Sequence, residues 1–440
     1  MNPVKYFRPN QVTFLSTDLR DGSQTPGINF HHAERVLIAQ HLADAGIDVI
    51  EAGFPISSKT HNTSVTEIAK TVGVLQNAPV IAGFARTGRF DKAGQFLTED
   101  IDAAWDAIRF ARFPRIHIVG TGSDLHLREK YRSEGTNGRS RADNLKIVEK
   151  SIRHAENLMV SHGFEPDIEF SPEDCGRADL DYLTLLFTQV IDAGATTLNV
   201  PDTVGRMRPE QYGHMLGALI NNVPGGQTVR WSTHTHDDLG LATANALAGV
   251  QSGARQVEGT FLGIGERAGN TCLEQIITII GLYGMTEMGV STDFQLARMQ
   301  TVSAHISRLS NTSICATAPV VGKNAFRHKS GMHQDGILKS PEVYQDIPPE
   351  RVGRRIELEL GPDSGRAGLF YCAEQLGYTI APKEQNRVYA AFKILADQIG
   401  LVEDEDLSSL LNQVLATPPQ QSIHVQKDLN LKVKPANIRV

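Results

Sequence analysis

A regular alternation of short β-branched runs with helix-like segments constrains the fold of this chain more than any other feature. Segments such as 33–46 and 180–194 separate the runs and end in glycine, the residue that most often stops a helix. Eight alternations are typical of a (β/α)8 barrel, whereas an open doubly wound sheet usually has fewer units. We therefore expect an α/β protein built on a TIM barrel. The eight runs are 11–17, 48–54, 79–85, 115–121, 167–173, 196–203, 229–236 and 255–265.

The pattern changes after residue 300. Residues 319–353 are rich in glycine, proline and charge, as in a linker that carries functional loops, and residues 373–415 have the pattern of a small helical unit. We expect the barrel in residues 1–300, a linker in 301–360, and a small helical subdomain with a tail in 361–440. Because the stretch after residue 415 is short, we expect no full regulatory domain there.

Composition excludes several classes of partner. The net charge of −7 gives no general attraction to nucleic acid or to an anionic membrane. The four cysteines form no CxxC pair, so a reducing cytoplasm suits the chain better than an oxidising compartment. The N-terminus lacks the apolar run of a signal peptide, and no stretch approaches the roughly 20 apolar residues of a membrane span. We expect a cytoplasmic protein.

Polar residues follow nearly every predicted strand. The carboxyl ends of barrel strands carry the catalytic residues of TIM-barrel enzymes, and stability alone does not require polar groups there. The sequence therefore predicts one site at the mouth of the barrel. The candidates, in chain order, are Asp18, Arg20, Asp21, Gln24, Glu51, Arg86, His117, Ser123, His126, Ser171, Glu173, Asp174, Arg177, Asn199, Asp202, Thr203, His234, His236, Glu266, Arg267 and Asn270.

His234 and His236 are the strongest metal-ligand candidates. Residues two apart in a strand face the same side, so both imidazoles can reach one ion. A carboxylate is the natural third ligand for Zn²⁺, Mn²⁺ or Fe²⁺. Strand 1 closes the barrel beside strand 8, which makes Asp21 the geometric candidate. The alternative for an isolated pair of this kind is two solvated histidines at a strand end.

The segment "GIGERAG" at 263–269 matches a dinucleotide fingerprint, but it follows the eighth predicted strand and not the first. Loops after strands 7 and 8 of a barrel often bind phosphate. We therefore interpret the segment as a ligand loop that offers backbone amides, and not as a nicotinamide site.

These residues resemble the metal-dependent Claisen-condensing barrels, namely the 2-isopropylmalate, homocitrate and citramalate synthases. The wording "EAGFP" is more similar to the isopropylmalate branch. The matching motifs, in order, are "TDLRDGSQTPG" (17–27), "IEAGFP" (50–55), "EFSPEDCGR" (169–177), "NVPDTVG" (199–205), "HTHDDLGLATAN" (234–245), "GIGERAGN" (263–270) and "SGMHQDGILK" (330–339).

The resemblance implies a reaction in which acetyl-CoA loses a methyl proton, attacks the ketone of a 2-oxo acid, and is hydrolysed to release CoA. It implies a divalent ion, whether Zn, Mn, Mg, Fe or Co, that chelates the 2-oxo acid. It also implies a homodimer in which the loop of His333 reaches the partner's barrel. The implied roles are metal ligands Asp21, His234, His236 and Asn270; alkoxide stabilisation by Arg20; carboxylate binding by Thr203; pocket lining by Gln24, His117, Ser171 and Asn199; a place in the reacting cluster for Glu173; and the base His333.

Departures from the family pattern keep alternatives open. Ser16, Asp18 and Ser23 differ from the usual first motif, Leu262 replaces a usual Asn, and Asp237 replaces another. Because of the first three, a non-catalytic scaffold remains an alternative. An enzyme like hydroxymethylglutaryl-CoA lyase is another, although "SGMHQDG" and the helical appendage argue against it. The short C-terminal stretch predicts no inhibition by leucine.

Glycines at positions 120 and 122 suggest a substrate difference. The isopropylmalate enzymes usually carry bulkier residues there, so we expect a larger pocket at the end of strand 4. A bulkier 2-oxo acid, such as phenylpyruvate, is then an alternative to 2-oxoisovalerate. Refilling of the space by neighbouring side chains is the opposing interpretation.

Overall fold

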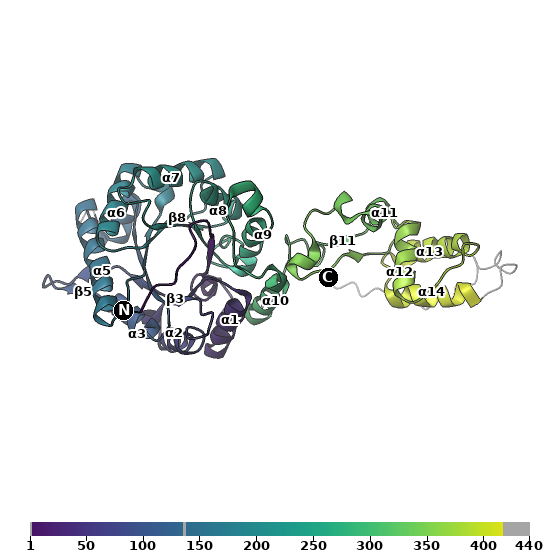
Figure 1. The fold of residues 1–440 in the computed structure, drawn as a ribbon, viewed down its shortest axis with the longest axis horizontal. Coiled ribbons are helices and arrows are strands. Elements are labelled where there is room, and N and C mark those ends of the chain that lie inside the picture. Colours follow the sequence, from purple (N-terminus) through teal and green to yellow (C-terminus); the bar gives the residue numbers. More distant parts are fainter. Residues whose placement is uncertain (1, 135–137, 417–440) are drawn as a thin grey trace. The chain divides into compact units, whose positions relative to one another are not determined.

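The computed structural model describes residues 2–134 and 138–416, and it contains the predicted (β/α)8 barrel. Eight parallel strands close in the order β1-β10-β9-β8-β7-β6-β3-β2, so that β1 pairs with both β10 and β2. Figure 1 shows the helices as a ring outside these strands. The barrel strands are β1 (Thr13–Ser16), β2 (Val49–Gly53), β3 (Val80–Arg86), β6 (Pro114–Thr121), β7 (Ile168–Glu173), β8 (Thr197–Asp202), β9 (Arg230–Thr235) and β10 (Gln256–Gly259).

The helices around the barrel are amphipathic. Helix α6, for example, buries Leu183, Leu186, Phe187 and Val190 at helical spacing, and Asp179 caps its start by accepting from the Tyr182 amide. The elements outside the strands are α1 (His32–Ala45), α2 (Lys59–Thr71), a hairpin of β4 (Arg89–Phe90) and β5 (Phe96–Leu97), α3 (Glu99–Ile108), α4 (Asp124–Lys130), α5 (Arg141–Ser161), α6 (Leu180–Asp192), α7 (Pro209–Asn222), α8 (Ala242–Gln251), α9 (Leu273–Tyr283) and α10 (Met299–Ser310).

Charged side chains fill part of the barrel interior. Arg115 lies inside, where its guanidinium bonds to Asp167 at 2.8 Å, to Glu169 at 3.0 Å and to Gln256 at 2.8 Å. All four residues are buried. A buried charge is stable only when it is paired and hydrogen-bonded, as Arg115 is here. This paired layer forms a polar floor inside the barrel.

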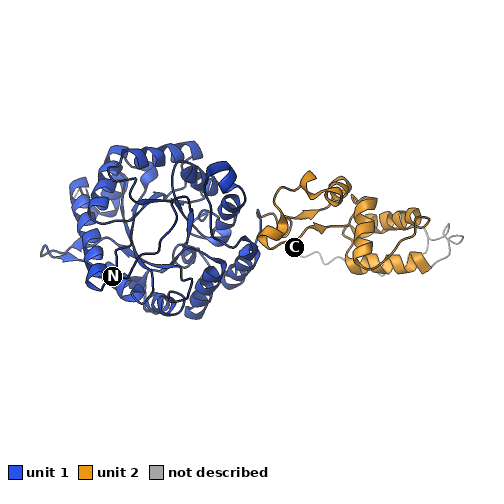
Figure 2. Cartoon of the chain, viewed as in Figure 1, with its two compact units in different colours: residues 1–315, 319–321 blue, residues 316–318, 322–440 orange. Residues whose placement is uncertain are grey.

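The chain divides into two compact units, which Figure 2 colours separately. The first comprises residues 1–315 and 319–321, and the second comprises 316–318 and 322–440. The division expected at residue 300 falls at the start of α10, a helix that packs against α1 in the first unit. The tail expected after residue 415 lies almost wholly outside the described residues. In the described part of the chain, no helix is long and apolar enough to cross a membrane.

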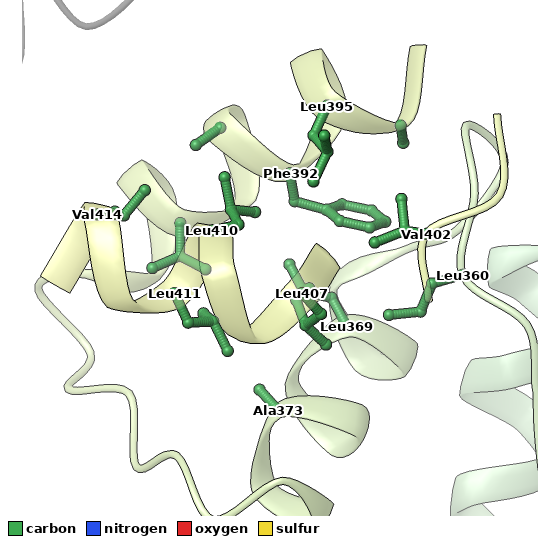
Figure 3. Packing of buried hydrophobic residues seen from close by; sticks show 13 residues of the cluster. Leu360, Leu369, Ala373, Phe392, Leu395, Val402, Leu407, Leu410, Leu411 and Val414 are labelled. Atoms are coloured by element: carbon green, nitrogen blue, oxygen red, sulfur yellow. The ribbon is translucent and has the colours of Figure 1, made fainter. Parts of the chain in front are cut away.

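The second unit has a small core of its own. Leu407, Leu410, Leu411 and Val414 repeat at helical spacing and are buried on one side of α14. Figure 3 shows their side chains in one cluster with Phe392 and Leu369. The elements of this unit are β11 (Arg327–His328), α11 (Gly331–Lys339), β12 (Glu357–Leu358), α12 (Arg366–Gln375), α13 (Gln385–Ile399) and α14 (Asp404–Ala416).

Candidate metal and substrate site

The predicted site residues of the barrel meet at its mouth. Of the barrel residues to which the resemblance assigns roles, all except Asn270 line one cavity of about 210 Å³. Eight of the other candidates are not among its lining residues, namely Asp18, Glu51, Arg86, Ser123, His126, Asp174, Arg177 and Asp202. Loops and strand ends far apart in the sequence thus converge at the carboxyl ends of the strands, as in other TIM barrels. The lining consists of Arg20, Asp21, Gln24, Phe84, His117, Val119, Ser171, Glu173, Asn199, Pro201, Thr203, His234, His236, Glu258, Glu266 and Arg267.

Three ligand atoms in this cavity surround one point. The Nε2 atoms of His234 and His236 lie 3.3 Å apart, and Asp21 Oδ2 lies 3.5 Å from the first and 3.8 Å from the second. Tetrahedral ligands at about 2.1 Å from an ion are themselves about 3.4 Å apart. The three atoms therefore have the spacing of a divalent metal site.

The protonation of both imidazoles suits a metal ligand. His236 Nδ1 lies 3.2 Å from the carbonyl of Gly269, which can only accept, and His234 Nδ1 lies 3.0 Å from Glu258. Each Nδ1 then carries the proton, and each Nε2 directs a lone pair at the shared point. Burial lowers the pKa of both histidines to about 4, so both are neutral at pH 7. Two lone pairs and a carboxylate facing one another repel unless a cation lies between them.

Asp21 and Asn270 complete the donor set. Burial alone would raise the pKa of Asp21, but the charge of Arg20 and the two imidazoles hold it below its usual value. The backbones of Asn270 and His236 form an isolated antiparallel β-bridge. The side chain of Asn270 donates from Nδ2 to Ile264 O at 3.1 Å. Its buried Oδ1 has no hydrogen-bond partner among the described residues. A cation is one group that would satisfy such an oxygen.

A second group of ligand types, His117, Glu169 and Glu258, lies within the barrel but is a poorer metal site. Both ring nitrogens of His117 are engaged, Nδ1 with Glu51 at 2.7 Å and Nε2 with Ser171 at 2.6 Å. Burial opposes protonation, yet the carboxylates of Glu51 and Glu169 raise the pKa of His117 to about 9. An imidazolium has no lone pair to give to a metal.

Arg20 is aimed into the cavity by a carboxylate on each side. Its Nε donates to Glu51 at 2.7 Å and its Nη1 lies 3.1 Å from Asp21. The guanidinium also lies 4.6 Å from the centre of the Phe84 ring. This fixed, largely buried cation can stabilise negative charge that develops on a substrate oxygen.

Ser171 and Thr203 present hydroxyl hydrogens to the cavity. Ser171 Oγ accepts from the imidazolium of His117 and from Asn199 Nδ2 at 2.9 Å. Thr203 Oγ1 accepts from the Asp174 amide at 2.9 Å. Each hydroxyl acts as an acceptor in these bonds, which leaves its own hydrogen to donate. Two such donors beside Arg20 suit a carboxylate.

Glu173 has a different partner from the one that its sequence neighbours suggest. Arg177 is the nearest cation to Glu173 in the sequence, but its Nε donates to Asp174 at 2.7 Å. The carboxylate of Glu173 instead contacts the ammonium of Lys130. Glu173 therefore faces the cavity without pairing with Arg177.

His333 belongs to the second unit and is not among the residues that line the cavity. It lies in the first turn of α11, where Ser330 caps the helix by accepting from the His333 amide. Its ring is stacked on Tyr344, with 4.1 Å between the ring centres. Its predicted role as the base stays a prediction.

The glycines at positions 120 and 122 do not enlarge the cavity, so that expectation is wrong. A Cβ on Gly120 would lie 2.8 Å from the Phe170 ring, and one on Gly122 would lie 3.0 Å from Glu173 O and 3.3 Å from Leu183. Side chains alternate along a strand, so Val119 faces the cavity while Gly120 faces away. These glycines give no reason to expect a bulkier 2-oxo acid.

Sequence reasoning missed Glu258, which holds His234 in its ligand tautomer. The signal was present, because a carboxylate in the middle of a predicted barrel strand must face inward and find a partner. The "GIGERAG" loop contributes the side chains of Glu266 and Arg267 to the cavity. Its amides at Gly263, Gly269 and Asn270 donate within the loop or to Thr260, which weakens the expectation that backbone amides bind the ligand.

Two family profiles match this chain, one mainly in the first compact unit and one in the second. The HMGL-like family profile matches residues 11–306, and the profile described as homocitrate synthase post-HMGL domain-like matches residues 320–399. The structure resembles the HMG-CoA lyase of Bacillus subtilis with a TM-score of 0.53 at 19% identity, covering 70% of this chain and 96% of that one. At that identity the likeness shows the shared barrel fold alone.

Sequence relatives extend over both units. A 2-isopropylmalate synthase of Lysinibacillus sphaericus is 40% identical over 407 residues, which are 92% of this chain and 74% of that protein. A chloroplastic 2-isopropylmalate synthase of Arabidopsis thaliana is 39% identical over 94% of this chain and 64% of its own length. With this identity and coverage, and with the matching order of motifs, the chain belongs to the 2-isopropylmalate synthase family.

Proposed function

We propose that this protein is a divalent-metal-dependent enzyme that condenses acetyl-CoA with a 2-oxo acid and releases CoA, and that 2-oxoisovalerate is its substrate. The observation that carries the proposal is the convergence of His234 Nε2, His236 Nε2 and Asp21 Oδ2 beside Arg20. When bound there, a divalent ion supplies Lewis acidity toward the ketone of the 2-oxo acid.

The residues of the chain divide the remaining work. Thr203 and Ser171 donate to the carboxylate of the 2-oxo acid, and Arg20 stabilises the alkoxide that forms at the former ketone oxygen. A base takes one proton from the methyl group of acetyl-CoA, and that carbon forms a bond to the ketone carbon. The alkoxide then takes up a proton and becomes the hydroxyl group of the product. Water then cleaves the thioester, which leaves a carboxylate and free CoA thiol. Glu173 faces this cavity, and His333 of a partner subunit is the candidate base.

The cellular setting follows from the same features. Names of the relatives in both bacteria and a plant refer to 2-isopropylmalate synthesis, so we place the reaction in amino-acid biosynthesis. We propose a homodimer in the cytoplasm. The four cysteines form no CxxC pair, which suits a reducing compartment.

The test is a thiol-release assay on chelator-treated enzyme. We expect no CoA release without metal, release after Zn²⁺, Mn²⁺, Mg²⁺, Fe²⁺ or Co²⁺ is added, and the highest kcat/KM with 2-oxoisovalerate. The panel includes pyruvate, 2-oxoglutarate and phenylpyruvate, which represent citramalate, homocitrate and benzylmalate synthesis. Higher kcat/KM for one of these would reassign the substrate. Release with none of them would contradict the proposed reaction, and net cleavage of a product-like thioester would indicate a lyase.

A further inference from the structure

Lys130 is the cation that contacts Glu173. Glu173 is the last residue of β7 and lines both the central cavity and a neighbouring cavity of about 290 Å³. Lys130 is the last residue of α4, lines only the neighbouring cavity, and places its ammonium against Glu173 Oε2. The Glu173 carboxylate thus lies between the central cavity and Lys130, and Lys130 does not line the central cavity.

Both ends of α4 are fixed to the strands that carry the site. At the start, Ser123 accepts from the His126 amide at 3.1 Å and donates to Asp174, the neighbour of Glu173. At the end, the hydroxyl of Tyr131 is hydrogen-bonded to Thr121 of β6 at 3.2 Å. Lys130 is therefore held at a defined position relative to β7, as a residue that orients another side chain must be.

Two other cations near Glu173, Arg177 and Arg86, have partners elsewhere. Arg177 donates to Asp174 at 2.7 Å, and Arg86 donates to Asp100 at 2.6 Å. Within the described residues, the ion pairs of the structure give Glu173 no cationic partner besides Lys130. The orientation of this carboxylate consequently depends on a single side chain.

We propose that Lys130 is a positioning residue for Glu173, which it holds in the orientation needed for the condensation. The inference rests on the proposed function, because it assigns Glu173 a place in that reaction. It makes Lys130 necessary for turnover without direct contact with the reacting atoms.

A double-mutant cycle tests this role. We expect Lys130→Met to lower kcat about tenfold or more, with KM for either substrate changed less than about twofold, because the loss of positioning affects the chemical step. Lys130→Arg should recover most of the activity. In a Glu173→Gln background, Lys130→Met should have no further effect, since residues that act through one another are not additive. Lys59→Met, an exposed lysine of α2 outside both cavities, is the matched control.

Additive losses in kcat, or a raised KM for acetyl-CoA that persists with Glu173→Gln, would overturn the proposal, because Lys130 would then act independently of Glu173. A crystal structure of the Lys130→Met variant gives a readout without turnover. We expect the Glu173 carboxylate to leave its position while Asp174 stays, and an unmoved carboxylate would overturn the proposal. If the unaltered enzyme releases no thiol with any 2-oxo acid, the proposed function fails and the crystal structure alone decides the role of Lys130.

Discussion

At the scale of single residues, burial and hydrogen bonding prepare His234 and His236 for a cation before one arrives. Their Nδ1 atoms are held by Glu258 and by the carbonyl of Gly269, and their pKa values of about 4 keep them neutral. The next residue, Asp237, has a different task. Its Oδ1 accepts from the amide of Ala242, the first residue of α8, at 2.9 Å.

His236→Ala should therefore abolish metal-dependent turnover, whereas Asp237→Asn should retain much of it, because an amide oxygen can accept the same hydrogen bond from Ala242. Steady-state CoA release and metal content per subunit measure the two effects. Equal losses in both variants would contradict the ligand assignment.

His117 provides a prediction about pH. Its folded pKa of about 9 exceeds the unfolded value of about 6.5. The stabilisation from its protonated form is thus fully present below pH 6.5 and is lost as the pH rises through 9. We expect NMR of the imidazole nitrogens to show a protonated His117 at pH 7.5, and Glu51→Gln to lower its titration midpoint. A midpoint near 6.5 in the unaltered protein would contradict the role of Glu51.

Most of the site could be predicted at this scale, because catalytic residue types stand at strand ends in a fixed order. The spacing of His234 and His236 required only the two-residue alternation of a strand. What could not be predicted were contacts between strands far apart in sequence, such as Glu258 with His234 or Lys130 with Glu173. Nothing local to Glu173 distinguishes Lys130 from the nearer Arg177.

At the scale of elements, the first strand explains one departure from the family pattern. The motif usually begins with Asp and has Thr two residues later. In this chain Ser16 stands at the usual Asp position and Asp18 at the usual Thr position. The two side chains are buried and bonded to each other at 2.7 Å. Asp18, whose pKa burial raises to about 7, also accepts from the Phe261 amide and so ties β1 to the loop after β10. Relative to that usual motif, the carboxyl and the hydroxyl have exchanged places, and in this chain they are hydrogen-bonded to each other.

Ser16→Asp alone should lower the melting temperature, because it would bury two carboxyl groups against each other. Adding Asp18→Ser should restore much of the loss by returning the pair to one carboxyl and one hydroxyl. Differential scanning calorimetry of the three proteins checks this. A double variant less stable than Ser16→Asp alone would show that the two positions are not interchangeable.

The loop after β10 contains a second departure. Leu262 has a φ of 62°, a left-handed conformation that costs a leucine about 1–2 kcal/mol but suits asparagine better. Two bonds of about 3 Å from its amide to Glu274 hold it there. We expect Leu262→Asn, the usual residue of the family, to raise the free energy of unfolding by about 1 kcal/mol in urea titrations. A decrease would mean that the packing of the leucine side chain outweighs the backbone strain.

The strands and helices of the barrel could be predicted from the sequence, because eight β-branched runs alternate with amphipathic segments. The prediction of a larger pocket at Gly120 and Gly122 was wrong because of the direction in which these positions face, although the strand itself was predicted correctly. A glycine near a strand end can face the cavity or the helices, and only the register fixed by His117 and Val119 decides between them.

At the scale of the whole molecule, the candidate base and the candidate metal ligands lie in different compact units. His333, stacked on Tyr344, is the residue that the dimer hypothesis assigns to the partner's barrel. No pattern within one chain encodes which copy supplies that loop, so this part of the site could not be predicted from local sequence.

Mixing two inactive variants tests the shared site. His236→Ala removes a metal ligand from one barrel, and His333→Ala removes the candidate base from the other chain. If sites are built across a dimer, half of the randomly mixed dimers carry one intact site out of two, so activity should recover to about a quarter of the unaltered value. Unfolding and refolding the mixture and then measuring CoA release checks this. No recovery, with mixed dimers verified by mass spectrometry, would place both residues in one chain's site.

Anomalous diffraction from crystals grown with Zn²⁺ and a 2-oxo acid tests the central claim most directly. We predict one strong peak at the zinc edge within about 2.0–2.2 Å of His234 Nε2, His236 Nε2 and an oxygen of Asp21, with the 2-oxo acid's ketone and carboxylate oxygens beside it. A peak among His117, Glu169 and Glu258, or no peak at a metal concentration that supports turnover, would contradict it.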